Sequence, residues 1–324
     1  MRPFPKILAV FLAALATTSV PFAAGLPAWA FPQAAPGGGG PKPPPDDGSA
    51  KHVPDSTVAL TKQQIAAHGP TIPDWHPEDH PPLPDIVGHG REPAVFACGY
   101  CHTPTGAGRP ENTSLAGLTP DYIKQQVRAF KEGKRPGSDP KRGPQLAMIV
   151  DAKALTDAEL DQAAAYFSSI PPASFVKVVE TDMVPKTYVA GNILAKSPAG
   201  GTEPIGNRIV EVPEELARFD LRDARTPYIA YVPVGSIQKG AALVVTGGGG
   251  KFPLCAICHG ADLHGLGDIP RLAGRSPSYL MRQLYDIKNG GRKDLNAILM
   301  KGVVDNLTDD DMLNLVAYIA SCRP

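Results

Sequence analysis

Two segments of the chain carry apolar residues at helical spacing and have matching beginnings and ends. They are Asp121–Gly133 and Ser278–Gly290, preceded by Thr119-Pro120 and Ser276-Pro277. A hydroxyl side chain at the N-cap stabilises a helix start, and proline fits the first helical position because its missing N–H would be unpaired there. Glycine is favoured just beyond a helix end. We therefore predict one helix in each segment.

Thr156 and Thr308 open two more segments of this kind. Each threonine is followed three residues later by an acid, Glu159 or Asp311, in the pattern of a capping box. Apolar residues then recur at helical spacing, with Leu160, Ala164 and Phe167 in one segment and Leu313, Val316 and Ile319 in the other. Both segments are predicted to be helices.

The predicted helices belong to an internal repeat. At an offset of 157, Leu115-Ala116-Gly117 recurs as Leu272-Ala273-Gly274, and the residues that match singly include Tyr122 with Tyr279, Gln126 with Gln283 and Arg135 with Arg292. From Met148 and Met300 onward the offset is 152, which a five-residue length difference in one loop explains. The pattern predicts two copies of one helical domain, residues 96–172 and 236–324.

The segment between the copies, residues 173–235, has a different pattern. Phe175–Val179, Asn207–Val212 and Tyr228–Val232 are short β-prone runs separated by proline and glycine turns. We predict an irregular connector with short strands. It either covers the surface between the two domains or docks a partner.

Composition and charge narrow the possible functions. The 324 residues allow two domains, and 32 basic residues balance 32 acidic ones. Without a basic run there is no electrostatic footprint for nucleic acid, so we expect no nucleic-acid partner. Half of the 36 prolines precede residue 95, so the repeats themselves are not unusually rich in proline.

The first 30 residues have the layout of a secretory signal peptide. Arg2 and Lys6 precede the apolar run Ile7–Ala16, and Ala28-Trp29-Ala30 offers a small-x-small cleavage site. We expect export to the periplasm with cleavage after Ala30. The alternative is an uncleaved membrane anchor, and only in that case do we expect membrane contact. Residues 31–50 are predicted to be a flexible linker, and residues 51–95 an irregular lead-in with surface histidines.

Each copy begins with a CxxCH motif, Cys98-Gly-Tyr-Cys101-His102 and Cys255-Ala-Ile-Cys258-His259. This motif is the attachment signature of c-type haem. Two cysteines one helical turn apart can reach both vinyl groups of the porphyrin, and the histidine supplies the proximal iron ligand. A zinc ribbon would place its cysteine pairs closer together, a redox dithiol would need a βαβ context, and disulfides would leave both histidines unexplained. We predict two covalently attached c-type haems.

Methionine is the expected sixth ligand of both irons, since Met/His ligation is usual in cytochromes. Met148 and Met300 correspond in the two copies, and we expect both to lie in loops. For the first haem, His89 is a rival ligand. The fifth cysteine, Cys322, is either a half-buried bystander or a reactive thiol.

With these residues the chain resembles class I c-type cytochromes, and in particular the two-domain dihaem cytochromes of the bacterial periplasm. The matching elements are CxxCH, the Leu-Ala-Gly turn before a helix with tyrosine, the methionine, and a last helix ending in AYF or AYI. The resemblance implies an all-α fold of two tandem cytochrome c domains. It also implies that Gly240 packs against Tyr318. The first copy departs from the family, because no clear helix precedes Cys98.

We weigh three functions. The first is a carrier that moves electrons between periplasmic redox proteins, such as a dehydrogenase and an oxidase or another cytochrome. The second is a haem enzyme, either a peroxidase or a sulfur-compound oxidoreductase, which would need an iron with an exchangeable site. The third is the cytochrome subunit of a dehydrogenase complex. The chain has no nucleotide loop or Ser/His/Asp array that we can place.

Overall fold

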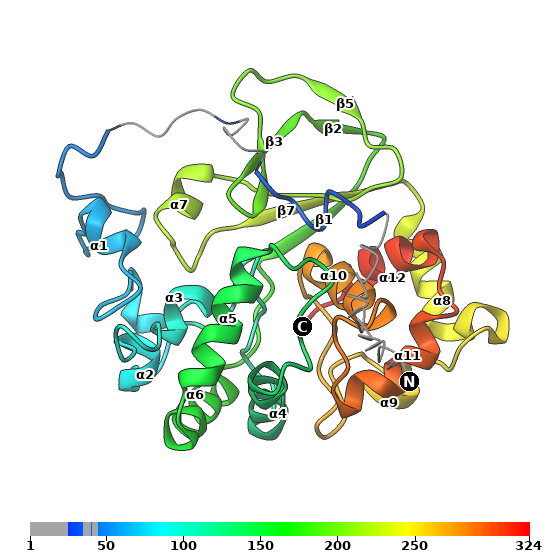
Figure 1. The fold of residues 1–324 in the computed structure, drawn as a ribbon. Helices are drawn as coiled ribbons and strands as arrows, with labels where there is room; N and C mark the ends of the chain where they lie inside the picture. The colour runs from blue at the N-terminus through cyan, green and yellow to red at the C-terminus, as the bar shows by residue number, and fades with distance from the viewer. Residues whose placement is uncertain (1–24, 35–39, 41–44) are drawn as a thin grey trace, which may run out of the picture.

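Two helical lobes lie side by side beneath a connector that contains the β-strands (Figure 1). The computed structural model describes residues 25–34, residue 40 and residues 45–324. In this part of the chain, no helix is both long enough and apolar enough to cross a membrane.

The first lobe is built around three longer helices, and its helices are α2 (Asp85–Gly88), α3 (Cys98–His102), α4 (Pro120–Lys131), α5 (Gly143–Ala154) and α6 (Asp157–Ser169). The Thr119 hydroxyl accepts a hydrogen bond from the backbone N–H of Tyr122 at the start of α4. The Thr156 capping box opens α6. The N-caps predicted from the sequence are thus confirmed. The helix before the haem motif, α2, is only four residues long.

The second lobe repeats this order with a longer first helix, and its helices are α8 (Ser236–Gly250), α9 (Cys255–His259), α10 (Pro277–Lys288), α11 (Leu295–Val304) and α12 (Asp309–Ser321). Helix α8 crosses α12 at Gly240. A Cβ atom at this position would lie 2.6 Å from the Cβ of Tyr318 and 2.0 Å from the carbonyl oxygen of Asn314. The predicted contact between Gly240 and Tyr318 is confirmed, and it depends on the absence of a side chain at residue 240.

Met148 and Met300 lie in helices, so the prediction that both lie in loops is wrong. Met148 is in the middle of α5, and Met300 is in the second half of α11. Both helices contain good helix formers, with Leu146 and Ala147 in α5 and Leu295 and Ala297 in α11. Pro144 in the first turn favours the start of α5, and the Asp294 side chain caps α11 by accepting from the N–H of Ala297. The two segments are mostly apolar and have no distinct polar and apolar faces, so their sequence pattern did not indicate a helix.

The connector forms one three-stranded sheet and two ribbons, from strands β1 (Val176–Glu180), β2 (Met183–Pro185), β3 (Thr187–Ala190), β4 (Ile193–Lys196), β5 (Thr202–Pro204), β6 (Val210–Pro213) and β7 (Tyr228–Val232), with helix α7 (Leu216–Asp220) before β7. Its sheet has the order β1-β7-β6, with β1 parallel and β6 antiparallel to β7. These three strands fall on the runs where strands were predicted. The ribbons pair β2 with β5 and β3 with β4.

The lead-in is a packed segment, with a short α-helix, α1 (Lys62–Ala66), and a 3₁₀ turn (Pro77–Asp79) before α2. Trp75 is 2% exposed, and its indole N–H donates to the carbonyl oxygen of Leu221 at 2.7 Å. The ring of His76 is also buried, with Nε2 3.2 Å from the Asp223 carboxylate. The prediction of surface histidines is therefore wrong for His76, because the connector supplies a buried partner that the local sequence does not reveal.

The N-terminal residues divide into two parts. Residues 1–24, which hold most of the predicted signal peptide, lie outside the described residues. Trp29, Ala30 and Phe31 are described and are buried in the core of the second lobe. Phe31 was predicted to lie in a flexible linker. That prediction is wrong, because its ring packs edge-on against Tyr285 of α10.

We expect Gly240→Ala to destabilise the protein by about 1–3 kcal/mol, because the added methyl group would overlap the backbone of α12. Gly302→Ala is the matched control. Gly302 lies in α11, and a Cβ added there would meet no atom within 4 Å, so this change should cost nothing and gain from helix propensity. Thermal unfolding followed by circular dichroism measures both. Equal melting temperatures for the two variants would contradict the close crossing.

Candidate functional site

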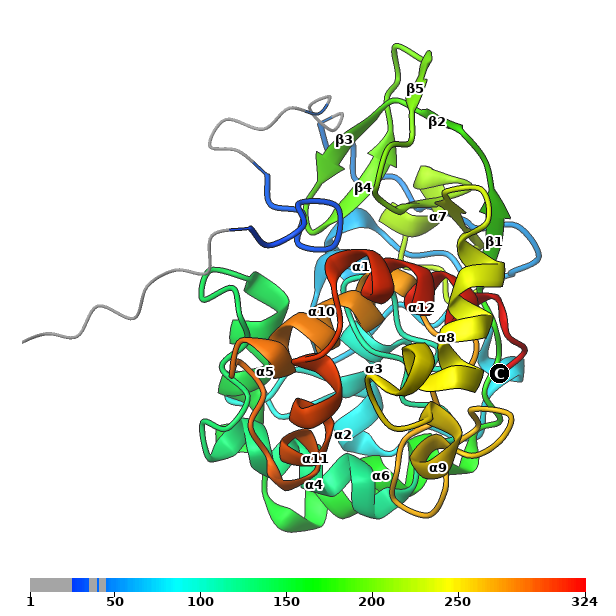
Figure 2. The same ribbon diagram turned by 90° about the vertical axis from the view of Figure 1, so that its right-hand side faces the viewer.

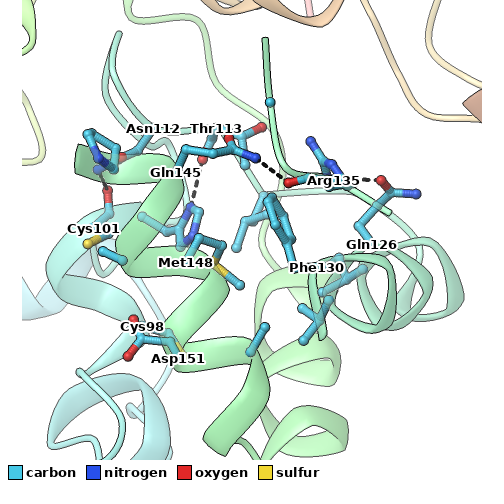
Figure 3. A pocket seen from close by; sticks show the side chains of 18 of the residues that line it. Cys98, Cys101, Asn112, Thr113, Gln126, Phe130, Arg135, Gln145, Met148 and Asp151 are labelled. Atoms are coloured by element: carbon cyan, nitrogen blue, oxygen red, sulfur yellow. Dashed lines mark hydrogen bonds between the residues drawn. The ribbon is translucent and has the colours of Figure 1, made fainter. Parts of the chain in front are cut away.

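One cavity in the first lobe brings together the four residues predicted to serve the first haem. Cys98, Cys101, His102 and Met148 all line it. Its walls are mostly apolar and come from α4, α5, α6, the loops and α10 of the second lobe, with Leu115, Ile123, Phe130, Leu160 and Phe167 among them. Figure 3 shows the side chains of Cys98, Cys101 and Met148 around the same space, between α3 and α5. A flat apolar group with polar edges fits such a site.

The orientation of His102 is set by one hydrogen bond. Its Nδ1 donates to the carbonyl oxygen of Thr113 at 2.9 Å, eleven residues along the chain. Burial lowers the pKa of His102, so the ring is neutral, and its Nε2 keeps a lone pair. A neutral imidazole whose other nitrogen donates to a carbonyl is the usual form of a metal-binding histidine.

The second copy has the same arrangement. His259 is 6% exposed, and its Nδ1 donates to the carbonyl oxygen of Pro270 at 2.9 Å, again eleven residues along the chain. Burial also lowers the pKa of this histidine. The loop after each motif therefore folds back in the same way and holds each imidazole by the same atom.

The cysteines of the two motifs have free thiols on short helices. Cys98 and Cys101 are three residues apart, which places them on one helix face. Burial raises the pKa of Cys98 to about 12 and that of Cys101 to about 11, so both are neutral thiols. In the second copy Cys255 is half-buried and Cys258 is exposed. Two paired thiols, a neutral imidazole and apolar walls fit the covalent attachment of a c-type haem.

The two methionines differ in their surroundings. Met148 shares the first cavity with His102. Met300 is half-buried and packs against the second lobe's core cluster, as Cys255 does. His89, the rival ligand for the first haem, is exposed and lies 3.5 Å from Asp85, and it is not among the residues that line the cavity. Cys322 is half-buried at the end of α12.

Asp151 is a cavity residue that the sequence pattern did not single out. It lies beside Cys98 (Figure 3), and one carboxylate oxygen accepts from the backbone N–H of Phe96 at 3.1 Å. Burial raises the pKa of Asp151. At the offset of 152, the corresponding residue of the second copy is Val303. The first site therefore holds an ionisable group that the second site lacks.

A polar cluster built on repeat-related residues joins the two lobes. The guanidinium of Arg135 donates to the side-chain oxygens of Gln126 and Gln283, both at 2.9 Å. The guanidinium of Arg292 donates to the same two oxygens, at 2.9 Å and 3.1 Å. Burial, followed by the charge of Arg292, lowers the pKa of Arg135. All four residues match between the two copies, so the repeat already singled them out in the sequence. Only the structure shows that the two copies contact each other through them.

Comparisons with known proteins agree with this geometry. The family model for cytochrome c matches residues 90–171 and 237–323, one match in each lobe. Cytochrome c4 of Pseudomonas aeruginosa is 41% identical over 75 residues, which are 23% of this chain and 36% of the relative. The match thus spans about a third of that relative's length.

Two further comparisons cover more of this chain. The thiosulfate dehydrogenase electron acceptor of Stutzerimonas stutzeri is 27% identical over 238 residues, which are 72% of this chain and 82% of the relative. The solved structure of a thiosulfate dehydrogenase from Marichromatium purpuratum is similar with a TM-score of 0.50 and 26% identity, covering 74% of this chain and 39% of the other.

We expect Asp151→Asn to stabilise the protein at neutral pH. Because burial raises the folded-state pKa, the folded state loses stability as the pH rises from the unfolded pKa of about 3.9 through the folded value. Asparagine removes this loss and keeps an oxygen for the Phe96 N–H. The gain at pH 7 should stay below about 1 kcal/mol, since the carboxyl group is only partly buried.

Denaturant unfolding at several pH values measures the gain, which should disappear below about pH 4. Asp182→Asn, at an exposed connector carboxyl, is the control and should show no such pH-dependent gain. Parallel pH profiles for Asp151→Asn and the parent protein would contradict the prediction.

Proposed function

Because the chain belongs to the cytochrome c family, we propose that it is a dihaem cytochrome that transfers electrons between redox proteins of the periplasm. The observation that carries the proposal is the repeated site. Each lobe contains a family match, a CxxCH helix, and a histidine whose Nδ1 is held by a carbonyl eleven residues along the chain. Two equivalent sites in one chain suit an electron carrier.

Each residue of the two sites has a proposed role. Cys98 and Cys101, and likewise Cys255 and Cys258, would form the thioether bonds. His102 and His259 would bind the irons through Nε2, with Met148 and Met300 as the opposite ligands. A bound c-type haem supplies an iron that alternates between the ferric and ferrous states.

The protein sets the environment of this chemistry. The carbonyl oxygens of Thr113 and Pro270 fix the tautomer of each imidazole and make it a stronger ligand. The apolar walls of the first cavity exclude water and so favour the less charged state of the iron. Arg135 lines the first cavity, whereas its neighbour Arg292 is paired with the Asp294 carboxylate at 3.1 Å. The positive charge of Arg135 stabilises an added electron in the first site.

A redox titration of the purified protein, followed by visible and near-infrared spectra, tests the proposal. We expect two one-electron steps, six-coordinate spectra for both haems, and no peroxide turnover. A five-coordinate haem together with rapid peroxide consumption would instead make the chain a haem enzyme.

A second candidate is the electron-accepting subunit of a dehydrogenase that oxidises a small sulfur compound. The relative that favours it aligns with 72% of this chain and is named as a thiosulfate dehydrogenase electron acceptor. The test is to mix the oxidised protein with a purified thiosulfate dehydrogenase and thiosulfate. Haem reduction that requires the enzyme, together with co-elution without crosslinking, would support a subunit. Haem reduction without co-elution would support a freely diffusing carrier.

We expect Met148→Ala and Met300→Ala each to remove half of the near-infrared band that arises from Met–Fe ligation. Each should also lower one of the two midpoint potentials by about 0.1 V, a fraction of the roughly 0.8 V range that axial ligands span. The matched control is Met183→Ala, because Met183 is an exposed connector methionine. A full band and unchanged potentials in either ligand variant would contradict the assignment for that haem.

A further inference from the structure

A short N-terminal segment, residues 26–31, lies in the second lobe as a buried turn. Trp29 is 9% exposed, Ala30 is fully buried and Phe31 is 7% exposed. The carbonyl oxygen of Pro27 accepts from the N–H of Ala30 at 2.9 Å and from the N–H of Phe31 at 3.1 Å. We call residues 26–31 the strap. It folds on itself and then packs as a unit.

The second lobe holds the strap by two contacts from α10. Arg282 donates from Nη1 to the carbonyl oxygen of Ala30 at 2.8 Å. The ring of Phe31 meets that of Tyr285 edge-on, with centroids 6.2 Å apart. Arg282 is itself 4% exposed, so the Ala30 carbonyl satisfies a buried guanidinium. Removing this acceptor would leave a buried charge with one fewer partner.

The strap also reaches the first lobe. Phe31 is one of the residues that line the first haem cavity. Two residues later, the Gln33 amide donates to the carboxylate of Asp139, which belongs to the first lobe. The chain thus passes from the core of the second lobe to Asp139, which lines the first cavity. Figure 2 shows the backbone of this N-terminal segment in dark blue.

Cleavage after Ala30, which the sequence predicts, would conflict with these contacts. It would remove the buried Trp29 and Ala30 and both hydrogen bonds to Pro27. It would also turn the N–H of Phe31 into a charged ammonium group at a buried position near the Arg282 guanidinium. Burying a new ammonium group beside a like-charged guanidinium is unfavourable, and the carboxylates of Glu211 and Asp286 already offset the charge of Arg282 itself.

We propose that export processing cuts the chain before Leu26, and that the strap stays in the mature protein, where it closes the first haem cavity towards the second lobe. The step is the hydrolysis of one peptide bond by water, which leaves a carboxylate on the released leader and an amino group on the mature chain. Ala23, Ala24 and Gly25 provide small residues for such a cut. The inference rests on the proposed function, since it assumes export and a haem in the first cavity.

The N-terminus of the exported holoprotein tests the processing step. The natural chain is expressed in a Gram-negative host with haem-attachment machinery, and the mature protein is analysed by intact mass and N-terminal sequencing. A mature chain that begins at Leu26, or up to three residues before it, supports the proposal. A chain that begins at Phe31, or that keeps Met1, overturns it.

Two processed forms test the role of the strap. The same foreign leader is joined either to Leu26 or to Phe31, and the haem content, melting temperature and two midpoint potentials are compared. The form that lacks residues 26–30 should melt at a lower temperature. One of its potentials should also fall, because water that enters the first cavity favours the ferric state.

Point variants keep the test decisive if the shorter form does not fold. Trp29→Ala should lower the melting temperature, and Phe31→Ala should in addition lower one potential. Ala28→Ser, at an exposed position of the same turn, should change neither. If Phe31→Ala keeps two haems with unchanged potentials, the proposed role of the strap in closing the first cavity is overturned, and the proposed function is not. A full-length protein without covalent haem would overturn the proposed function instead.

Discussion

One hydrogen bond in each lobe fixes the position of the CxxCH histidine, on which the rest of the lobe depends, and it runs from the imidazole to a carbonyl eleven residues along the chain. A histidine at the end of a five-residue helix has little structure of its own to hold it. The following loop must therefore return to the ring, and the Leu-Ala-Gly turn then starts the next long helix. Local caps set where that helix begins, so one constraint orders the motif, the loop and the helix together.

The two copies share this arrangement, but different segments of the chain pack over it in each lobe. In the second lobe a long first helix lies against the last one, and the missing side chain of Gly240 allows their backbones to touch. The first lobe has only four residues of helix in this place. Other segments cover it instead. The aromatic ring of Tyr100 lies beneath the Arg222 guanidinium of the connector at 3.4 Å and against His68 of the lead-in. The lead-in and the connector thus cover the first lobe in the place where one long helix, α8, covers the second.

The sequence allowed prediction of features that depend on local chemistry. Thr119, Thr156 and Thr308 cap helices through atoms three residues away, so their effect is visible in the sequence itself. The burial of His76 and Phe31 depends on partners elsewhere in the chain, Asp223 and Tyr285, and the sequence pattern did not reveal it. The same holds for Asp151, which is important only because it lines the cavity next to Cys98. The residues proposed to hold the haems could be predicted because CxxCH has a chemical meaning independent of the fold.

The cluster between the lobes bears on how the two sites differ. Arg135 and Arg292 share the same two amide oxygens and are related by the repeat, but only Arg292 has an ion pair, with the Asp294 carboxylate at 3.1 Å. The charges of the cluster are therefore not symmetric and can contribute to a difference between the two potentials. Further differences come from features present in one copy only. Asp151, for which the second copy has Val303, adds an ionisable group to the first site, and Phe31 adds an apolar cover. Negative charge near an iron favours the ferric state and exclusion of water favours the ferrous state, so these two features oppose each other at the first haem.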